Sequence, residues 1–292
     1  MVNARYVLAF TIVFVLAFSL PYVFTNRSPV EECVNKHLLR EFLESQYASE
    51  IGLLRASTSA NPDSSRVYVA SDNLLASRAL AVLNSKLASK VITTLNDRYG
   101  GGFDSLHEVL LGIKIPDKFY CRYNEYLGNV STSKFGTLEI YYEKPNYNCT
   151  IRNWDKYADL LVYKALNSLL HGSKSYAEHL FEKLMGMWDG NGFKDIAFRG
   201  EYSTYKIALA IFLYRALKAS KSSQIVKYNG IIEKCYKIIC EMQRGDGGIV
   251  TNYVVLNGKT IAVGDANTET TSIVVLALHS NYPEKIGSIS NH

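Results

Sequence analysis

Five acidic side chains stand at or just before the starts of apolar segments, and carboxylates placed in this way can perform acid–base chemistry. They are Asp72, Asp159, Glu201, Asp265 and Glu269. Two carboxyl groups across a cleft, one protonated and one ionised, are the groups that cleave a glycosidic bond. Asp265 and Glu269 are four residues apart and share one face if that segment is helical. The same acids are also common helix-capping residues, and this alternative stays open.

Asparagine and tyrosine side chains beside these acids are candidates for binding a sugar. The positions are Asn73, Tyr157, Tyr202, Tyr205 and Asn267. Tyrosine rings can stack on the apolar faces of sugar rings. A tyrosine at these positions can equally belong to the core, because the side chain is amphipathic.

Other catalytic signatures are missing from the chain. The run from Asp189 to Asp195 resembles a calcium loop but lacks the later ligands and the closing glutamate, which favours a plain turn. His107-Glu108 has no second histidine at the spacing of a zinc protease. The chain has no G-x-S-x-G, P-loop or dinucleotide fingerprint and no C-x-x-C pair. The sequence therefore predicts neither a metal nor a cofactor.

The composition narrows the class of protein. The 292 residues are 48% hydrophobic and 20% charged, which excludes a disordered chain. The mean hydropathy of −0.03 excludes a polytopic membrane protein. A net charge of +5, spread without a Lys/Arg run, is too weak to indicate nucleic acid as a partner.

Two kinds of helical pattern alternate along the chain. Segments that are apolar on nearly every face lie at residues 74–83, 159–170, 207–214 and 272–278. Segments with a single apolar stripe lie at residues 87–99, 176–188 and 231–242. The first kind is typical of helices inside an assembly, and the second of outer helices with one solvated face.

Glycine turns close the outer helices. They lie at residues 100–102, 190–192 and 245–248, where glycine supplies the left-handed backbone that ends a helix. The turns recur about every 55 residues once the non-helical stretch 115–150 is set aside. The unit is therefore an inner helix, an outer helix and a turn.

The stretch 115–150 predicts a β insert. Residues 119–126 and 138–142 are rich in aromatic and β-branched residues and are separated by polar turn residues. A second hairpin is predicted at 249–263, with Asn257-Gly258 as its two-residue turn.

One turn carries the sharpest resemblance to a known superfamily. It reads Gln243-Arg244-Gly245-Asp246-Gly247-Gly248 and is followed by Asn267-Thr268-Glu269-Thr270-Thr271-Ser272 at the start of an apolar helix. With the alternating helices, it resembles the α/α-toroid superfamily of terpenoid cyclases, prenyltransferases, six-hairpin glycosidases and polysaccharide lyases. Ile249 replaces the expected aromatic residue, and the acid, thioester and zinc motifs of these proteins are absent. The resemblance therefore implies an architecture rather than a reaction.

The resemblance implies a mainly α fold, either an α/α-hairpin toroid or an open arc of about eight helices, with a small β insert and a β-hairpin. In such a fold the N-terminal ends of the inner helices share one face, where their dipoles converge. We therefore expect Asp72, Asp159, Glu201 and Glu269 to line one basin. The turn at Asp246 is expected at the opposite rim.

The N-terminal segment indicates export. Residues 6–25 form an uncharged run after Arg5, and twenty residues of helix just span a hydrocarbon core of roughly 30 Å. The region around Pro21 is a poor match to a cleavage site. We interpret residues 1–25 as a membrane anchor, with a cleaved signal peptide as the alternative. Residues 26–292 are then an extracytoplasmic domain of a single-pass membrane protein.

Cysteines and glycosylation sequons agree with export. The sequons begin at Asn26, Asn129 and Asn148. Cys121 and Cys149 bracket the β insert, so we expect a disulfide between them. One of the five cysteines is left over and is expected to be a buried thiol.

These observations support two hypotheses. The first is a membrane-anchored, glycan-active enzyme, either a glycoside hydrolase or a polysaccharide lyase, with the membrane and a glycan as its partners. The second is a non-catalytic surface module that binds a glycan or an envelope protein.

The anchor hypothesis predicts that residues 6–25 stay attached to the mature protein. The length of the uncharged run and the poor cleavage site are the physical reasons. N-terminal sequencing of the protein recovered from membranes checks this. A mature chain starting at residues 20–26 would show that a peptidase removes the segment.

Overall fold

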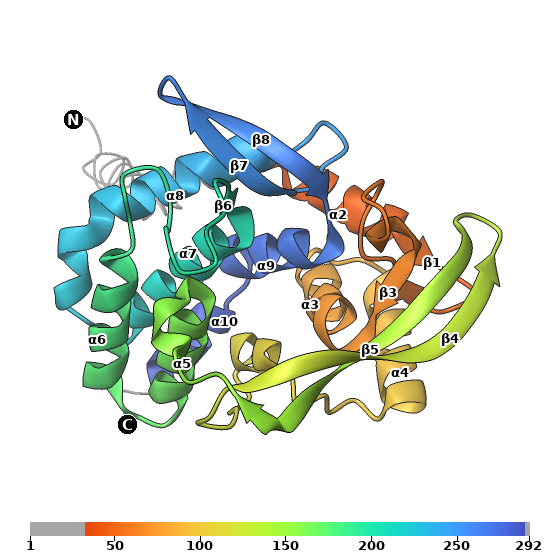
Figure 1. Cartoon of the computed structure of the whole chain (residues 1–292), viewed down its shortest axis with the longest axis horizontal. Coiled ribbons are helices and arrows are strands. Elements are labelled where there is room, and N and C mark those ends of the chain that lie inside the picture. The colour runs from red at the N-terminus through yellow and green to blue at the C-terminus, as the bar shows by residue number, and fades with distance from the viewer. Residues whose placement is uncertain (1–32, 290–292) are drawn as a thin grey trace, which may run out of the picture.

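Four buried helices form the centre of the molecule (Figure 1). They are α3 (Leu74–Val82), α5 (Ala158–Leu170), α7 (Thr204–Ala219) and α9 (Thr268–His279). The computed structural model describes residues 33–289. The helices lie side by side in the order α3, α9, α7, α5. Their sequences are apolar on almost every face, so each can be covered on several sides.

A second set of helices covers this centre. These are α2 (Lys36–Ser45), α4 (Leu87–Tyr99), α6 (Lys174–Met185), α8 (Asn229–Met242) and α10 (Tyr282–Ile289). The predicted pairing of inner and outer helices is present as α3 with α4, α5 with α6 and α7 with α8. Each outer helix buries one stripe, as α8 does with Ile232, Cys235, Ile238 and Met242.

Short helical turns connect several of these elements. They are η1 (Asp63–Ser65), the π-helical η2 (Val69–Asn73), η3 (Leu106–Leu111), η4 (Trp154–Lys156) and η5 (Gln224–Tyr228). The turn η2 runs directly into α3.

Within residues 33–289, three small sheets complete the fold. The first pairs β1 (Tyr47–Ala48) with β2 (Leu53–Leu54). The second has the order β3 (Arg66–Tyr68), β5 (Gly136–Thr150), β4 (Tyr120–Thr132), with β3 parallel to β5. The third has the order β6 (Tyr202–Ser203), β7 (Val250–Leu256), β8 (Lys259–Ala266). Asn257 and Gly258 both have positive φ, which confirms the predicted two-residue hairpin turn.

The prediction of a mainly α toroid of about eight helices is wrong. About 50% of the structure is helix and 23% is strand, in three sheets, so the fold is mixed α and β. The long insert and the β7–β8 hairpin were expected, but β1, β2, β3 and β6 were not. These strands have two or three residues, too few for an alternating pattern. They form because they pair with other strands, as β3 does with β5.

Two disulfides constrain the chain. Cys121 is bonded to Cys149, which confirms the predicted closure of the insert. Cys33 is bonded to Cys240 across 207 residues, and this bond was not predicted. Cys235 is the free cysteine within residues 33–289 and is buried in α8, as expected for the odd thiol.

The turn after α8 packs closely on α2. The amide of Gln243 accepts a hydrogen bond from Asn35 N (2.7 Å) and donates one to Asn35 O (3.1 Å). Gly247 has φ +89°, and a Cβ there would lie 2.0 Å from the carbonyl oxygen of Leu38. A Cβ at Gly248 would meet the Phe42 ring. The glycines of this turn therefore permit the close approach of α2.

The predicted anchor and the first sequon, at Asn26, lie outside the described residues. Within residues 33–289, no helix has the length and apolar character needed to cross a membrane. The sequon residues Asn129 and Asn148 are exposed on the β4–β5 ribbon, and their glycosylation stays a prediction.

Replacing Gly247 by alanine is expected to lower the free energy of unfolding by about 2–3 kcal/mol, because the new methyl group has no space and the backbone is left-handed. Urea unfolding followed by circular dichroism measures this. Gly245→Ala is the matched control, because no heavy atom lies within 4 Å of its added Cβ. Equal stabilities of the two variants would contradict the packing argument.

Candidate active site

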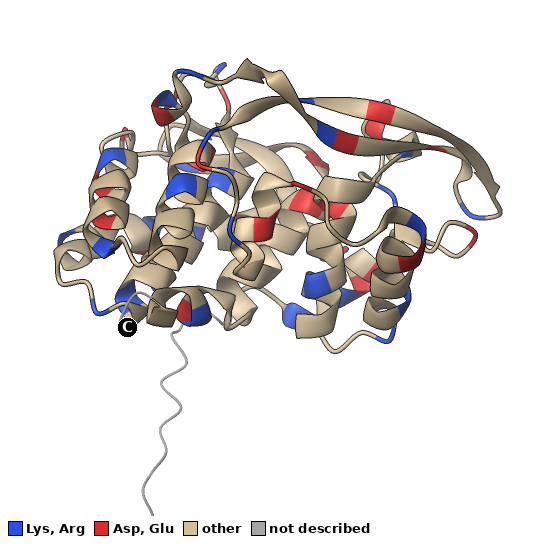
Figure 2. Cartoon of the chain, turned by 90° about the horizontal axis from the view of Figure 1, so that it is seen from below, with Lys and Arg blue, Asp and Glu red and all other residues tan. Residues whose placement is uncertain are grey.

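A cavity of about 290 Å³ opens between the β3–η2 segment, the base of the β7–β8 hairpin and the start of α9. It is lined by Ala56, Ser57, Ala60, Asp63, Tyr68, Asp72, Thr251, Gly264, Asp265, Asn267 and Glu269. Four of these residues are acidic and none is basic, so the lining disfavours an anionic ligand. In Figure 2, acidic positions gather near the centre of the molecule, between the helices and the long ribbon.

Asp72 is a buried carboxyl group on the wall of this cavity. It lies in η2, just before α3, with 5% of its surface exposed. Burial and the negative charge of Glu269 raise the pKa of Asp72 well above its ordinary value, and a hydrogen bond from Ser71 opposes this only in part. Asp72 therefore keeps its proton at a pH where an exposed aspartate has lost it.

Glu269 forms an ion pair with His107. The carboxylate lies in the first turn of α9, and its Oε1 is 3.1 Å from Nε2 of His107. Burial opposes a charge on His107, but the hydrogen bond and charge of Glu269 outweigh it and raise the pKa of the imidazole. Ser105 Oγ lies 3.2 Å from the other ring nitrogen. The imidazole therefore holds Glu269 in place.

Asp159 belongs to the same region. Its Oδ2 accepts a hydrogen bond from the hydroxyl of Tyr205 at 3.0 Å. Burial, followed by the charges of Asp159 and Glu269, raises the pKa of both Tyr205 and Tyr163. The Tyr163 ring in turn meets His107 edge-on, at 5.7 Å between centroids. Asp72 and Glu269, two of the four acids expected to share a basin, therefore line one cavity, whereas Asp159 is not among its lining residues and shares with Glu269 the neighbours Tyr205 and Tyr163.

Glu201 does not join this group, and that part of the prediction is wrong. Its side chain is exposed beside β6 and accepts a hydrogen bond from Asn252 of β7. The residue stands before α7, as expected, but the short strand β6 carries it to the sheet.

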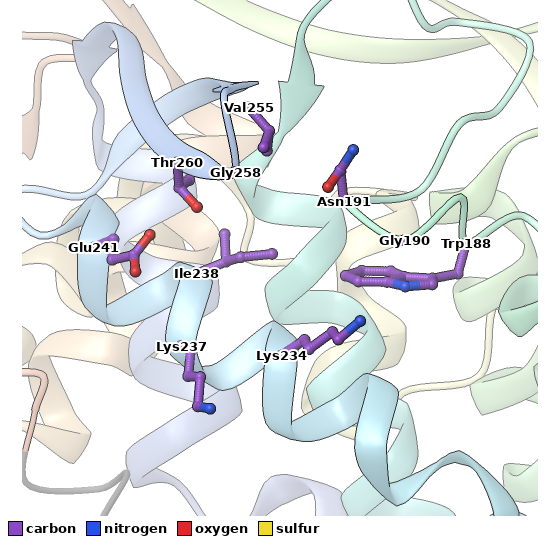
Figure 3. A pocket seen from close by; sticks show the side chains of 10 residues that line it. All are labelled: Trp188, Gly190, Asn191, Lys234, Lys237, Ile238, Glu241, Val255, Gly258 and Thr260. Carbon is purple, nitrogen blue, oxygen red and sulfur yellow. The ribbon is translucent and has the colours of Figure 1, made fainter.

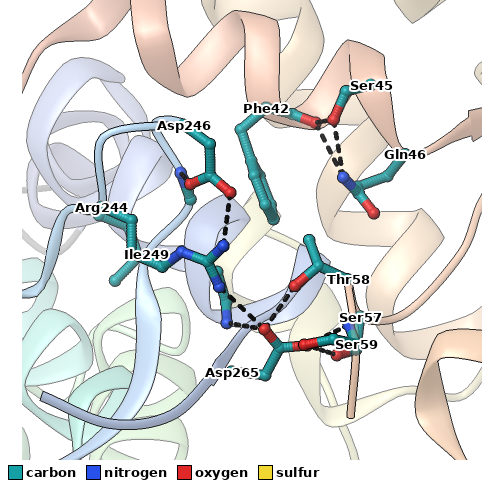
Figure 4. A network of polar contacts seen from close by, with 12 residues as sticks. Phe42, Ser45, Gln46, Ser57, Thr58, Ser59, Arg244, Asp246, Ile249 and Asp265 are labelled. Carbon is teal, nitrogen blue, oxygen red and sulfur yellow. Dashed lines mark hydrogen bonds and ion pairs between the residues drawn. The ribbon is translucent and has the colours of Figure 1, made fainter.

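Asp265 lies on the cavity wall but has a structural role (Figure 4). Its carboxylate accepts hydrogen bonds from the hydroxyls of Ser57 and Thr58 and from the backbone N–H groups of Ser59 (2.6 Å) and Ala60 (2.8 Å). Burial works against ionisation, yet these donors hold its pKa well below the usual range. A carboxylate so fully engaged is a poor acid or base.

Arg244 connects this network to the glycine turn. Its guanidinium contacts Asp265 at 2.9 Å and Asp246 at 2.8 Å. The turn therefore lies on the acidic side of the molecule, and its expected place at the opposite rim is wrong. The return through the β7–β8 hairpin brings the chain back to the same face before α9 begins.

Most of the predicted sugar-binding residues serve the core instead. Asn73 is fully buried and bonds to the backbone of Leu54 and Tyr68. Tyr202 stacks on Tyr253 and bonds to Asp189, while Tyr157 and Tyr205 pack against the core. Asn267 caps α9 by accepting from Thr270 N, although it also lines the cavity. Asn267 therefore caps its helix and the three tyrosines pack in or against the core, whereas the side chain of Asn73 makes no capping hydrogen bond to α3.

Three residues of the site were not predicted: Asp63, Tyr68 and His107. In the sequence, His107 is notable only as part of the incomplete zinc-protease pattern His107-Glu108. Its contact with Glu269 joins η3 to α9 across 162 residues, and no local pattern reports such a pairing.

A second cavity, of about 220 Å³, lies between the turn after α6, helix α8 and the tip of the β7–β8 hairpin (Figure 3). Trp188 and Lys234 face it, and Glu241 is the one acid among its lining residues. It therefore lacks the paired carboxyl groups of the first cavity.

Comparison with known proteins identifies no relative: no protein family, curated protein or solved structure matches the chain. Among residues 33–289, no group of three His, Cys, Asp or Glu side chains is arranged to hold a metal ion. Any inference about function therefore rests on the geometry of the site.

Replacing Asp265 by asparagine is expected to cost about 2–3 kcal/mol of stability at neutral pH. Asparagine has one acceptor oxygen, and if this oxygen accepts from the N–H groups of Ser59 and Ala60, the NH₂ group faces the donor groups of Thr58 and Arg244. The lowered pKa sets the direction of the pH dependence. The stabilisation is present above pH 3.8, the ordinary aspartate value, and is lost as the pH falls below it.

Denaturant titrations of both proteins across acidic and neutral pH measure this difference. Asp246→Asn, which changes the half-exposed partner of the same arginine, is the control and should have little effect. A stability difference for Asp265→Asn that is unchanged at low pH would refute the ionised network.

Proposed function

We propose that the chain is a glycoside hydrolase anchored in a membrane, with its domain outside the cytoplasm. The observation that carries the proposal is the pair formed by Asp72 and Glu269 in one cavity. Burial favours the protonated form of the first carboxyl group, and a histidine pairs with the second. Two carboxyl groups in different environments are what hydrolysis of a glycosidic bond requires.

The roles follow from these environments. Asp72 donates its proton to the glycosidic oxygen as the bond to the anomeric carbon breaks. Glu269 either attacks the anomeric carbon or takes a proton from the attacking water, and in both cases one water molecule is consumed. His107 is a positioning residue, because it fixes the carboxylate of Glu269 through the 3.1 Å contact.

The charge of the cavity favours a hydrolase over a lyase. A lyase acts on uronate sugars, whose carboxylate needs a cation nearby. The cavity lining has no basic side chain to bind that carboxylate, and the nearby Arg244 and His107 are already paired with Asp265 and Glu269. We therefore propose a neutral glycan as the substrate.

Export is supported by separate observations. The structure holds two disulfides, which form and persist in oxidising compartments. Two sequon asparagines, Asn129 and Asn148, are exposed on the ribbon. The uncharged run at residues 6–25 supplies the proposed anchor.

Asp72→Asn and Glu269→Gln are each expected to lower kcat on the active substrate by about 100-fold or more, because each removes a group that transfers a proton or bears charge in the reaction. Activity of the unchanged protein should fall as the pH rises through the raised pKa of Asp72. Release of reducing sugar from a panel of neutral β-glucan, mannan and chitin oligosaccharides provides the assay.

Glu201→Gln is the matched control, since Glu201 is an exposed acid outside the cavity. Equal activity of Asp72→Asn and Glu201→Gln would contradict the assignment. A chain that binds one of these glycans without cleaving it would instead be a non-catalytic glycan-binding module.

A further inference from the structure

Three tyrosines form a row across the sheet that borders the cavity. Tyr68 of β3 is registered with Tyr141 of β5, and Tyr141 is registered with Tyr126 of β4. Ring centroids are 5.9 Å apart for the first pair and 5.6 Å for the second. Registered partners point to the same face of a sheet, so the three rings form one continuous strip.

The row leads from the cavity to the exposed ribbon. Tyr68 lines the cavity, whereas Tyr126 at the other end is 53% exposed. The opposite face of the same sheet buries Val67 and Ile140 in the core. The tyrosine face therefore points away from the core, and Figure 1 shows that the β4–β5 ribbon extends beyond the helices.

Polar contacts hold the inner rings in place. The hydroxyl of Tyr68 donates to Asp63 at 3.0 Å, and that of Tyr141 donates to Glu139 at 2.9 Å. Arg66 lies over the Tyr141 ring, 5.2 Å from its centroid, and contacts both carboxylates. Rings fixed in advance lose little conformational freedom when a ligand binds.

We propose that the row Tyr68–Tyr141–Tyr126 binds the part of a neutral oligosaccharide that extends beyond the cavity. The charged groups of Arg66 and Glu139 lie in the neighbouring register row, beside the rings, and can bond to hydroxyls. Rings bordered by charged groups match the apolar faces and polar rims of successive sugar residues. This proposal rests on the proposed hydrolase function, and it assigns a preference for long substrates over short ones.

Tyr126→Ala tests the row at its exposed end, where folding depends least on the side chain. We expect KM for a long neutral oligosaccharide to rise about 3- to 10-fold, as loss of one aromatic contact does, with kcat unchanged. The disaccharide of the same linkage should show no change. Tyr126→Phe keeps the ring and should retain the KM of the unchanged protein.

Tyr123→Ala is the matched control. Tyr123 is 50% exposed on the same strand, three residues away and thus on the opposite face. Its removal should leave KM unchanged for both substrates. An equal effect of the two alanine variants, or an equal effect of Tyr126→Ala on short and long substrates, would overturn the proposal.

The two proposals fail in different ways. If the full chain cleaves neutral glycans and Tyr126→Ala leaves KM for long substrates unchanged, the row has no role and the hydrolase function stands. If the full chain neither binds nor cleaves any glycan of the panel, the proposed hydrolase function is wrong, and so is the proposed role of the tyrosine row.

Discussion

The carboxylate of Asp265 ties together segments that are remote in the sequence, and the cavity depends on this connection. It accepts hydrogen bonds from residues 57–60 and an ion pair from Arg244, at the point where β8 passes into α9. Glu269 follows within one turn of α9. Because the start of α9 is held in this way, the position of Glu269 relative to η2 is held as well. An ionised group with so many donors is among the stronger polar interactions available to a protein.

The pKa of Asp72 is shifted in the opposite direction to that of Asp265. This carboxyl group is more deeply buried than that of Asp265, has a single hydroxyl donor, Ser71, and faces the charge of Glu269. Burying an unpaired charge is costly, so the group responds by keeping its proton. Two aspartates on one cavity wall thus have pKa values shifted in opposite directions. The difference lies in the deeper burial of Asp72, in the charge of Glu269 beside it, and in the larger number of donors around Asp265.

The β insert is more than a surface excursion. Its strand β5 pairs with β3, the strand that leads into η2 and Asp72. The negative charge of Glu143 on β5 also acts on both Asp72 and His107. The Cys121–Cys149 disulfide joins the two strands at the open end of the ribbon, opposite its hairpin turn, and so limits the freedom of this wall.

Features that depend on neighbouring residues could be predicted from the sequence. Apolar and striped helices, the glycine turns, the Asn257-Gly258 hairpin and the Cys121–Cys149 bond follow from local periodicity and turn chemistry. Which acidic side chains lie close together depends instead on contacts between remote segments. The strand β6 places Glu201 outside the cavity. Hydrogen bonds from residues 57–60 make Asp265 a poor acid or base. The turn η3 places His107 next to Glu269. These outcomes depend on contacts between segments separated by up to about 200 residues. Burial and hydrogen bonding set the protonation state of a carboxyl group, and the residues next to it in the sequence specify neither of them.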